Sequence, residues 1–325
     1  MNKVHVKERR ERMELNLADR KVAMIFQGFS ANYKESFAML NSVQLNEIKN
    51  LCNVVNEKLS YDLWTYIHDT DNYTDDNQVM DWLAIYVANY SIYKAYLVTG
   101  YLPTMSLGYS MGLITAVACN GAISFEDGID IFNCISKYKR KHSKQKENMA
   151  VIIGRTEQEV AETIAKENLS DSVEVSIVNN EDCITISGMD EAVEQIVRIN
   201  QDAGALKASK LNSSIAFHSR YAIDGIEELE EVLSEINFKD LEIPILSVYS
   251  QKLLYHGTEL QEELIKNMYS KMEWMKTLNE TSSRGIEVFA DVSMDGSLTK
   301  LSRLVLDEHE FITLNKLNRN FQKIK

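Results

Sequence analysis

The apolar residues near the start of the chain form one continuous run. Val22 to Phe26 are all apolar, and Gly28 follows two positions later. A short apolar run that ends at a turn signal is typical of a strand buried on both faces of a parallel sheet. Helical periodicity then continues to Thr99, most strongly over 79–98, and Gly100 ends it. This succession of a buried strand and helices predicts an α/β fold.

A second strand and another helix are expected shortly after Gly100. Met105-Ser106-Leu107 is apolar at alternate positions and follows Pro103, so we predict a short strand. Residues 108–112 contain two glycines and predict a turn, and the small residues of 113–119 predict a helix. The chain therefore has a strand, a tight turn and a helix in direct succession.

A different pattern occupies residues 147–211. Its elements follow the order βαββαβ, which is typical of a ferredoxin-like fold, and the larger α/β pattern resumes at Ser213. We therefore predict an inserted ferredoxin-like subdomain. Its expected elements are a strand over 150–153, a helix begun by the capping box of Thr156 and Glu159, strands over 173–178 and 184–187 joined by a turn over 179–182, a helix over 189–202 and a strand over 206–211.

Composition and charge narrow the class of protein. Of 325 residues, 45% are apolar and 26% are charged, as in ordinary globular proteins. The net charge of −13 argues against nucleic-acid binding. No apolar run approaches the roughly 18 residues of a membrane span, and residues 1–20 form a charged arm without the apolar core of a signal peptide. We expect a cytoplasmic protein that binds neither nucleic acid nor membrane.

The cysteines do not indicate a metal site or a disulfide framework. None of the four forms a C-x-x-C pair, and none lies at metal-ligand spacing from a histidine. We expect reduced and mostly buried thiols, with no bound metal. The four positions are Cys52, Cys119, Cys134 and Cys183.

The turn at 108–112 carries candidate chemistry. Its sequence, Gly-Tyr-Ser-Met-Gly, fits G-x-S-x-G, and the expected strand and helix on either side are the context that this motif requires. Such a turn exposes the hydroxyl of Ser110 at a helix N-terminus, where the backbone N–H of Met111 can face a developing oxyanion. We predict that Ser110 is a nucleophile.

A serine nucleophile needs a base at neutral pH, and the chain has six histidines. His5 lies in the charged arm and His142 in a basic run. His218 lies in Ile215-Ala216-Phe217-His218-Ser219, a short apolar segment just after the predicted subdomain. It is the candidate base, and the alternative is a buried histidine satisfied by a backbone group.

The order and spacing of these segments resemble the malonyl-CoA:acyl-carrier-protein transacylase family, which includes the acyltransferases of polyketide synthases. The resemblance runs from Val22 to Arg303. The family's segments are matched by Phe26-Gln27-Gly28-Phe29-Ser30-Ala31-Asn32 for F-P-G-Q-G-S-Q, by 108–113 for G-H-S-x-G-E, by Ser124-Phe125-Glu126-Asp127 for S-F-E-D, by Phe217-His218-Ser219 for F-H-S and, loosely, by 291–298 for G-P-x-x-x-L.

The resemblance implies a fold and a division of the chain. The expected fold is an α/β-hydrolase-like acyltransferase core with an inserted ferredoxin-like subdomain. The core would comprise residues 21–146 and 212–325, and the subdomain residues 147–211. Residues 1–20 would be an arm outside both.

The resemblance also implies a mechanism. Ser110 would attack an acyl thioester and His218 would take its proton, while the backbone N–H groups of Met111 and Phe29 would form the oxyanion hole. The backbone carbonyl of Asn267, seven residues before Trp274, would orient the histidine. The acyl group would pass to a second thiol or to water. No cofactor is expected, since the substrate is carried on the phosphopantetheine of coenzyme A or of an acyl carrier protein.

One departure from the family concerns the acyl group. Family members bind the malonyl carboxylate with an arginine 25 residues after the serine, and this chain has Ile135 there. An apolar side chain cannot pair a carboxylate, and burying that charge unpaired costs several kcal/mol, roughly. We therefore predict that malonyl groups are poor substrates.

Other predicted acyl-pocket positions change in the same direction. Tyr109 replaces the family's histidine, Phe29 a glutamine, and Trp82 and Cys183 two further glutamines. Drift in an inactive paralogue is one interpretation. The other, which we favour, is a pocket rebuilt for an uncharged acyl chain, in a transferase or in a hydrolase that removes stalled chains.

A basic run follows on this acidic chain. It is either a solvated helix end or a docking patch for an acidic acyl carrier protein. The run comprises Lys137, Lys139, Arg140, Lys141, Lys144 and Lys146.

Three alternatives to a non-malonyl enzyme remain at this point. The protein could be a malonyl transferase that binds the carboxylate differently, or a non-catalytic partner that binds a carrier protein. A general α/β-hydrolase esterase is less favoured, because it would need a histidine near the chain end and His309 has no supporting context.

Overall fold

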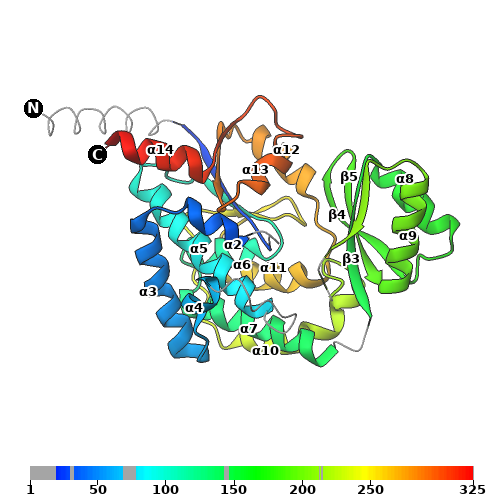
Figure 1. The fold of residues 1–325 in the computed structure, drawn as a ribbon, viewed down its shortest axis with the longest axis horizontal. Coiled ribbons are helices and arrows are strands. Elements are labelled where there is room, and N and C mark those ends of the chain that lie inside the picture. Colours follow the sequence, from blue (N-terminus) through cyan, green and yellow to red (C-terminus); the bar gives the residue numbers. More distant parts are fainter. Residues whose placement is uncertain are drawn as a thin grey trace, which may run out of the picture.

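The computed structural model describes residues 20–29, 33–68, 78–142, 146–211, 213 and 215–324. Most of the predicted arm, 1–19, lies outside the described residues. Figure 1 shows a large α/β core and a smaller α/β unit beside it. The smaller unit is made of the predicted insertion, so the structure confirms the mixed α/β class.

A six-stranded sheet forms the centre of the core, in the order β10-β9-β1-β2-β7-β8. The pairs from β10 to β7 are parallel, and β7 and β8 are antiparallel. The first two predicted strands are confirmed as β1 and β2. The bounds are β1 Val22–Phe26, β2 Met105–Gly108, β7 Ile245–Leu246, β8 Leu253–Leu254, β9 Val288–Val292 and β10 Glu310–Ile312.

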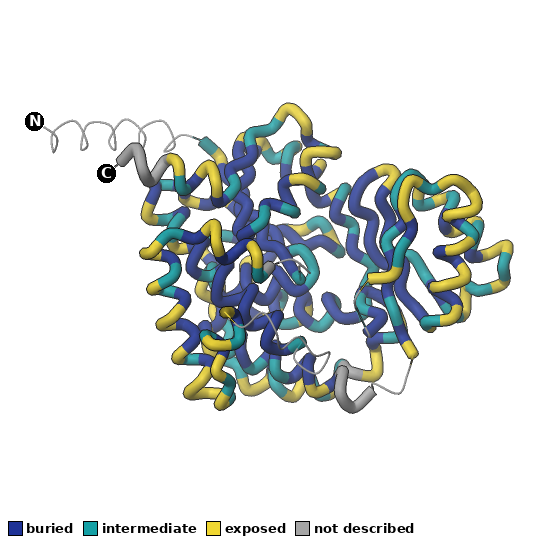
Figure 2. Tube along the Cα trace, viewed as in Figure 1, coloured by how far each residue is buried: buried dark blue, intermediate teal, exposed yellow. Residues whose placement is uncertain are grey.

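Helices cover both faces of this sheet. On β1, Val22, Met24 and Phe26 pack into a core shared with α3, α5, α6 and α7, whereas Ala23 and Ile25 face α12 and α13. Figure 2 shows the sheet as a continuous buried centre. The helices are α2 Tyr33–Ser36, η1 Phe37–Met39, α3 Ser42–Leu59, α4 Leu63–His68, α5 Gln78–Val98, α6 Gly112–Cys119, α7 Phe125–His142, η3 Arg220–Gly225, α10 Ile226–Ser234, α11 Gly257–Tyr269, α12 Trp274–Ser283, α13 Ser297–Ser302 and α14 Leu314–Ile324.

The smaller unit has a four-stranded antiparallel sheet in the order β4-β5-β3-β6. Two helices pack on it through their apolar faces, which gives a ferredoxin-like layout. The Thr156 hydroxyl accepts the N–H of Glu159, whose carboxylate accepts the N–H of Thr156, so the predicted capping box is confirmed. The elements are β3 Glu147–Ile153, α8 Glu157–Lys166, β4 Val173–Asn180, β5 Cys183–Met189, α9 Asp190–Asp202 and β6 Lys207–Lys210.

One boundary differs from the prediction in a way that bears on the site. We predicted a turn over 179–182, but β4 continues through Asn180 because Asn180 still pairs with Cys183. Met272 of the core also pairs with β4, through hydrogen bonds with Ser176 and Val178. The end of β4 is therefore held against the core.

Candidate active site

Ser110 lies in a tight turn between β2 and α6. Its backbone φ is +54°, a left-handed conformation that non-glycine residues seldom adopt. The flanking glycines permit a very close approach: a Cβ on Gly112 would lie 2.0 Å from the Phe26 carbonyl oxygen, and one on Gly108 2.3 Å from Leu113 Cα. The strand, turn and helix expected around Ser110 are therefore present, and the turn is packed against β1.

His218 reaches Ser110 from a segment 108 residues later in the chain. Ser110 Oγ and His218 Nε2 lie 2.8 Å apart, within hydrogen-bond distance. His218 also has a positive φ, +58°, and its backbone N–H donates to the Met268 carbonyl oxygen at 2.7 Å. The structure thus brings together the two residues that the sequence singled out as nucleophile and base.

The imidazole is deeply buried, with 1% of His218 exposed. Burial disfavours the cation and lowers the pKa of His218 to about 4, so the ring is neutral at neutral pH. A neutral imidazole has one N–H, and acceptance of the Ser110 proton at Nε2 requires that hydrogen to be on Nδ1. The arrangement suits a general base.

The surroundings of Nδ1 differ from the expectation for Asn267. The hydroxyl of Tyr249 lies 3.5 Å from Nδ1 and donates to Oδ1 of Asn267 at 2.6 Å. Asn267 thus approaches the site through its side chain, while the next carbonyl along α11, that of Met268, binds the His218 N–H. Sequence reasoning missed Tyr249, which lies in no recognisable motif.

The first loop lies directly beside the serine turn. A Cβ on Gly28 would lie 2.8 Å from the Tyr109 carbonyl oxygen and 3.3 Å from the Met111 nitrogen. Asn89 of α5 donates to the Gln27 carbonyl oxygen at 3.2 Å and holds this loop. Phe29 follows Gly28 and lines the same cavity as Met111. The two predicted oxyanion-hole residues therefore lie on adjoining backbone segments.

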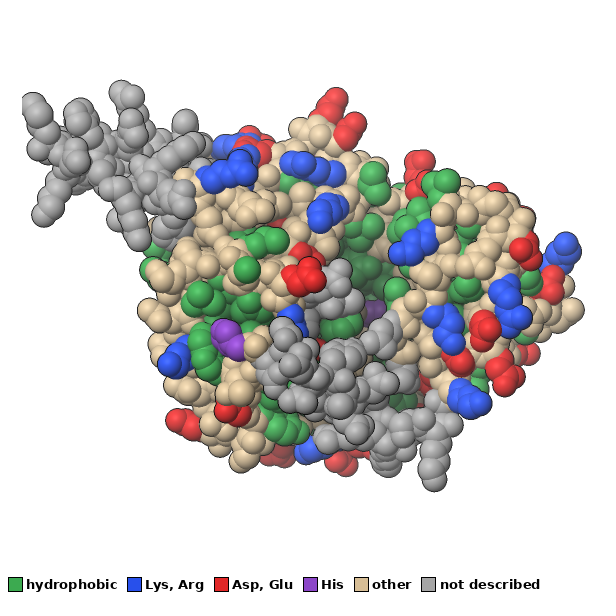
Figure 3. All heavy atoms as spheres, viewed as in Figure 1, with side chains coloured by type: hydrophobic (Ala, Val, Ile, Leu, Met, Phe, Trp, Pro, Cys, Tyr) green, Lys and Arg blue, Asp and Glu red, His purple; other side chains and the backbone are tan. Residues whose placement is uncertain are grey.

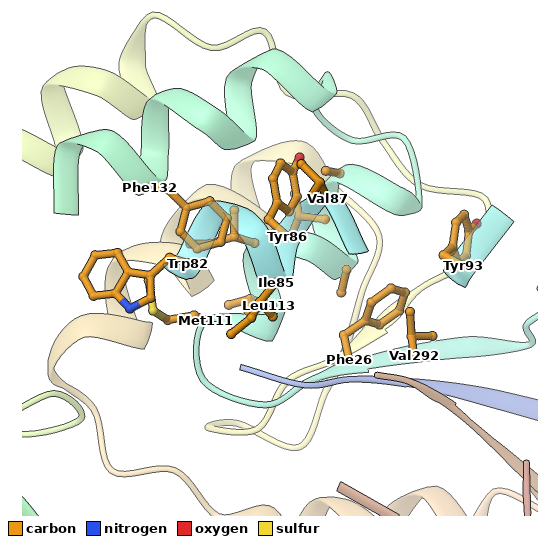
Figure 4. Close-up of a cluster of buried hydrophobic side chains, with 14 of the residues drawn as sticks. Phe26, Trp82, Ile85, Tyr86, Val87, Tyr93, Met111, Leu113, Phe132 and Val292 are labelled. Carbon is orange, nitrogen blue, oxygen red and sulfur yellow. The ribbon is translucent and has the colours of Figure 1, made fainter. Parts of the chain in front are cut away.

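A small cavity opens beside this turn, with a volume of about 10 Å³, room for a single water molecule. Figure 4 shows that Trp82, Tyr86, Phe132 and Met111 occupy this region with their own side chains. Among the residues that the structure describes, no charged side chain lines it. The lining residues are Gln27, Gly28, Phe29, Trp82, Ile85, Tyr86, Met111, Thr115 and Phe132.

The other predicted acyl-pocket residues lie elsewhere. Ile135 is 4% exposed and packs in the core, whereas Phe132, one helical turn earlier on α7, lines the cavity. Tyr109 faces the smaller unit: its hydroxyl donates to Asn179 Oδ1 at 2.7 Å, and its ring packs edge-on against Trp274.

Cys183 also contacts Asn179, the residue to which the Tyr109 hydroxyl donates. Its sulfur lies 3.8 Å from the side-chain nitrogen of Asn179, and burial raises the pKa of its thiol. Of the five positions predicted to shape the acyl pocket, Phe29 and Trp82 line the cavity. Tyr109 and Cys183 connect the core with β4 and β5, because β4 extends further than predicted.

Around this site, Figure 3 shows hydrophobic side chains gathered in the hollow between the core and the smaller unit. Among the described residues, no group of three or more metal-ligating side chains is present. In the same part of the chain, no helix is both long enough and apolar enough to cross a membrane.

The predicted basic patch is only partly described. Lys137 is exposed on α7, and the side chains of 139–142 and all of 143–145 lie outside the described residues. Lys137 borders a groove between α7 and α10 that is otherwise rich in carboxylates, namely Asp127, Asp130, Glu228, Glu231 and Glu235. The side of Lys137 that faces this groove is therefore acidic.

Comparison with known proteins connects this geometry to one family. The family model described as "Acyl transferase domain" matches residues 41–319. The malonyl CoA-acyl carrier protein transacylase of Escherichia coli K12 is 25% identical over 262 residues, which cover 79% of this chain and 84% of that protein. The polyketide biosynthesis protein ThaF of Burkholderia thailandensis is 28% identical over 258 residues, 78% of this chain and 22% of ThaF.

Solved structures share the fold. The malonyl CoA-acyl carrier protein transacylase of Coxiella burnetii superposes with a TM-score of 0.81 at 21% identity, covering 94% of this chain and 97% of that one. The acyltransferase domain from the second module of the salinomycin polyketide synthase gives a TM-score of 0.75 at 20% identity, covering 94% and 71%. The predicted acyltransferase core with its inserted subdomain is thus confirmed as the fold.

Proposed function

This chain belongs to the acyl transferase domain family, and on that premise we propose that it transfers acyl groups from thioesters through an acyl-Ser110 intermediate. The single observation that carries the proposal is the 2.8 Å contact between Ser110 Oγ and the buried, neutral His218 Nε2. A nucleophile within hydrogen-bond reach of an unprotonated base is the arrangement that covalent catalysis needs.

The proposed acylation follows from these positions. Ser110 Oγ attacks the thioester carbonyl carbon while His218 Nε2 takes the hydroxyl proton. The N–H groups of Met111 and Phe29 stabilise the oxyanion. When the C–S bond breaks, the departing sulfur takes the proton from Nε2. An incoming thiol then gives its proton to Nε2 and attacks the acyl-serine in the same way, which frees Ser110.

We further propose that the acyl group is uncharged and carried on phosphopantetheine. The described residues that line the cavity beside Ser110 are apolar or neutral polar, so none of them offers a malonyl carboxylate a cationic partner. The likeness to malonyl CoA-acyl carrier protein transacylases and to a malonyl-transacylase solved in complex with a type II polyketide synthase acyl carrier protein supports such a carrier as partner. ThaF supports a role in polyketide biosynthesis.

Intact-protein mass spectrometry with a panel of acyl pantetheines tests this function. We expect acetyl pantetheine, which carries the smallest neutral acyl group of the panel, to add one acyl mass to the wild-type protein and malonyl pantetheine to add none. Ser110→Ala should abolish every adduct, and Ser106→Ala, on the preceding strand, is the matched control that should leave them unchanged. Adducts that persist in Ser110→Ala would refute the proposed nucleophile, and efficient malonyl loading would refute the uncharged acyl group.

The same experiment separates transfer from hydrolysis. With a holo carrier protein as acceptor, a transferase moves the label to the carrier, whereas a hydrolase releases free acid and leaves little acyl-enzyme. We propose transfer as the principal reaction, because the Escherichia coli relative named above is a transacylase. Release as acid at the rate of loading, with a carrier present, would instead assign hydrolysis.

A further inference from the structure

The Nδ1 side of His218 contains a chain of hydrogen-bonding groups that the acylation step leaves unexplained. The Tyr249 hydroxyl lies 3.5 Å from Nδ1, and it donates its only hydrogen to Oδ1 of Asn267 at 2.6 Å. The hydroxyl therefore presents a lone pair toward the ring. When Nε2 accepts from Ser110, the ring hydrogen must be on Nδ1. Each group then donates to the next: Ser110 to His218, the His218 Nδ1–H toward the Tyr249 hydroxyl, and that hydroxyl to Asn267.

The structure holds Tyr249 and Asn267 in a fixed relation. The backbone N–H of Tyr249 donates to the Ser247 hydroxyl at 3.1 Å, and the preceding carbonyl, that of Val248, accepts from Glu273 at 3.1 Å. Asn267 is buried on α11, the helix whose Met268 carbonyl binds the His218 backbone. One helix end thus positions both the main chain and the ring of His218.

The protonation states of the hydrogen-bonded groups Tyr249 and His218 follow from their surroundings. Burial, and the nearby carboxyl group of Glu263, raise the pKa of Tyr249 well above its ordinary value, so its hydroxyl stays protonated and keeps its hydrogen on Asn267. Burial accounts for the low pKa of His218, and no carboxylate in the described part of the chain contributes to it. Among the described residues, a neutral phenol therefore occupies the position where a serine triad would have an acid.

We propose that Tyr249, oriented by the side chain of Asn267, is a positioning residue that fixes the tautomer of His218 and stabilises its imidazolium during acylation. This inference rests on the proposed function of Ser110 and His218. A contact of 3.5 Å is long for a neutral ring, and hydrogen bonds of this kind shorten when the imidazole becomes charged. The stabilisation is therefore exerted mainly in the transition state.

Steady-state and pH-dependent kinetics of acyl transfer test the role of the hydroxyl. Tyr249→Phe should lower kcat about 10-fold to 100-fold with little change in KM, because a hydrogen bond to a developing charge is lost. It should also move the acid limb of the pH–rate profile to lower pH, since the protonated ring loses an acceptor. Tyr255→Phe, on an exposed tyrosine, is the matched control.

The variant Asn267→Ala removes the side chain and keeps the backbone carbonyl, so its kinetics show which of the two groups acts on His218. If the side chain orients Tyr249, Asn267→Ala should lower kcat by a similar factor, and Tyr249→Phe combined with Asn267→Ala should be no slower than the worse single variant. If only the carbonyl matters, Asn267→Ala keeps wild-type kcat and pH profile, which overturns the proposal. Wild-type rates in Tyr249→Phe would overturn it as well.

Labelling of Ser110 separates failure of this inference from failure of the proposed function. A wild-type protein whose adducts depend on Ser110, combined with a silent Tyr249→Phe, refutes only the positioning role. A wild-type protein that forms no Ser110 adduct refutes the function on which the inference rests. Unchanged unfolding midpoints in both variants would exclude misfolding as the cause of a slower rate.

Discussion

Glu263 is a buried carboxyl group beneath the His218 site, with 3% of the residue exposed. Burial raises its pKa to about 7, against the hydrogen bonds that it accepts from Ser247 and Val248. Its Oε1 has no hydrogen-bond partner among the described residues. The folded protein therefore binds a proton at this group between its unfolded pKa of 4.5 and about 7, where the unfolded chain does not.

Glu263→Gln should consequently stabilise the protein at alkaline pH. Because the folded pKa is raised, the wild type loses stability as pH rises from about 4.5 to 7, by about 3 kcal/mol in total. The neutral amide resembles the protonated acid and escapes this loss. Urea unfolding at several pH values checks it: the variant should gain about 3 kcal/mol near pH 8 and almost nothing near pH 4. A gain that is independent of pH would contradict this account.

At the residue scale, the sequence was informative where chemistry lies in a motif. Ser110 was identified by its flanking glycines and His218 by its short apolar segment. Tyr249 was not, because its role arises from tertiary contacts with His218 and Asn267, 31 and 18 residues away. Nothing in the residues around Tyr249 records those contacts.

The turn between β2 and α6 depends on the absence of a side chain at Gly112. A Cβ there would meet the backbone of Phe26 and Gln27 at 2.0–2.8 Å, and backbone atoms cannot move aside cheaply. Gly112→Ala should therefore push α6 away from β1, lower the free energy of unfolding by about 1–3 kcal/mol and displace Ser110. We expect loss of most labelling of Ser110 by a serine-reactive probe.

Gly204→Ala is the control for a general effect of replacing glycine. Gly204 lies in the smaller unit and has φ +85°, but apart from its chain neighbours no described residue has an atom within 4 Å of an added Cβ. The variant should cost about 1 kcal/mol of backbone strain and label like the wild type. Equal loss of labelling in both variants would contradict the close-approach argument.

The helices α5 and α7 set the size of the cavity beside Ser110. Trp82 projects from α5 toward Met111, and Phe132 of α7 lies nearby (Figure 4). The indole ring of Trp82 packs edge-on against Phe217. Trp82→Leu should admit longer acyl chains, because each additional methylene then becomes buried, for about 0.8 kcal/mol each. Loading of hexanoyl relative to acetyl pantetheine should rise about 10-fold or more.

Trp64→Leu on α4 is the matched control for this change, because Trp64 is not among the residues lining the cavity. Acyl preference should be unaltered there. If Trp82→Leu also leaves the ratio of hexanoyl to acetyl loading unaltered, the acyl chain does not enter this cavity.

At the element scale, sequence patterns predicted β1, the short β2, α5, α6 and the elements of the smaller unit, and no element after residue 213 was predicted. The apolar run of β1, the long and mostly apolar segment of α5 and the capping box of α8 are local patterns that the sequence records. The strands β7 and β8 have two residues each and carry no periodicity. The extension of β4 to Asn180 depends on pairing with Cys183, which no local preference for asparagine indicates.

At the scale of the whole molecule, the connection between the core and the smaller unit combines a shared apolar cluster, which includes Met149 and Ile177, with polar contacts that were not predictable. Tyr109 binds Asn179, Met272 pairs with β4, and Arg220 binds Glu174 of β4 at 2.7 Å. The order of elements predicted that a ferredoxin-like unit is inserted. Where it contacts the core depends on side chains far apart in sequence, including the Tyr109 that we had assigned to the acyl pocket.

The charge distribution beside α7 bears on how an acidic carrier protein would dock. Lys137 belongs to the basic run of the sequence, but the groove that it borders contains five carboxylates. Attraction by the run would therefore be opposed by the facing helix α10, and the balance is sensitive to ionic strength. The affinity for a carrier protein that docks here should fall when lysines of the basic run are removed and rise when carboxylates of the groove are removed.

Two sets of variants test this arrangement. Replacing Lys137, Lys139 and Lys141 with glutamate should raise the KM for an acyl carrier protein substrate about 10-fold at low salt, and replacing Glu231 and Glu235 with lysine should lower it. Neither set should change the KM for an acyl pantetheine, because that substrate has no protein surface to attract. Equal effects on both substrates would show that the charges act on the site itself, and loss of the carrier effect at high salt would support an electrostatic encounter over α7.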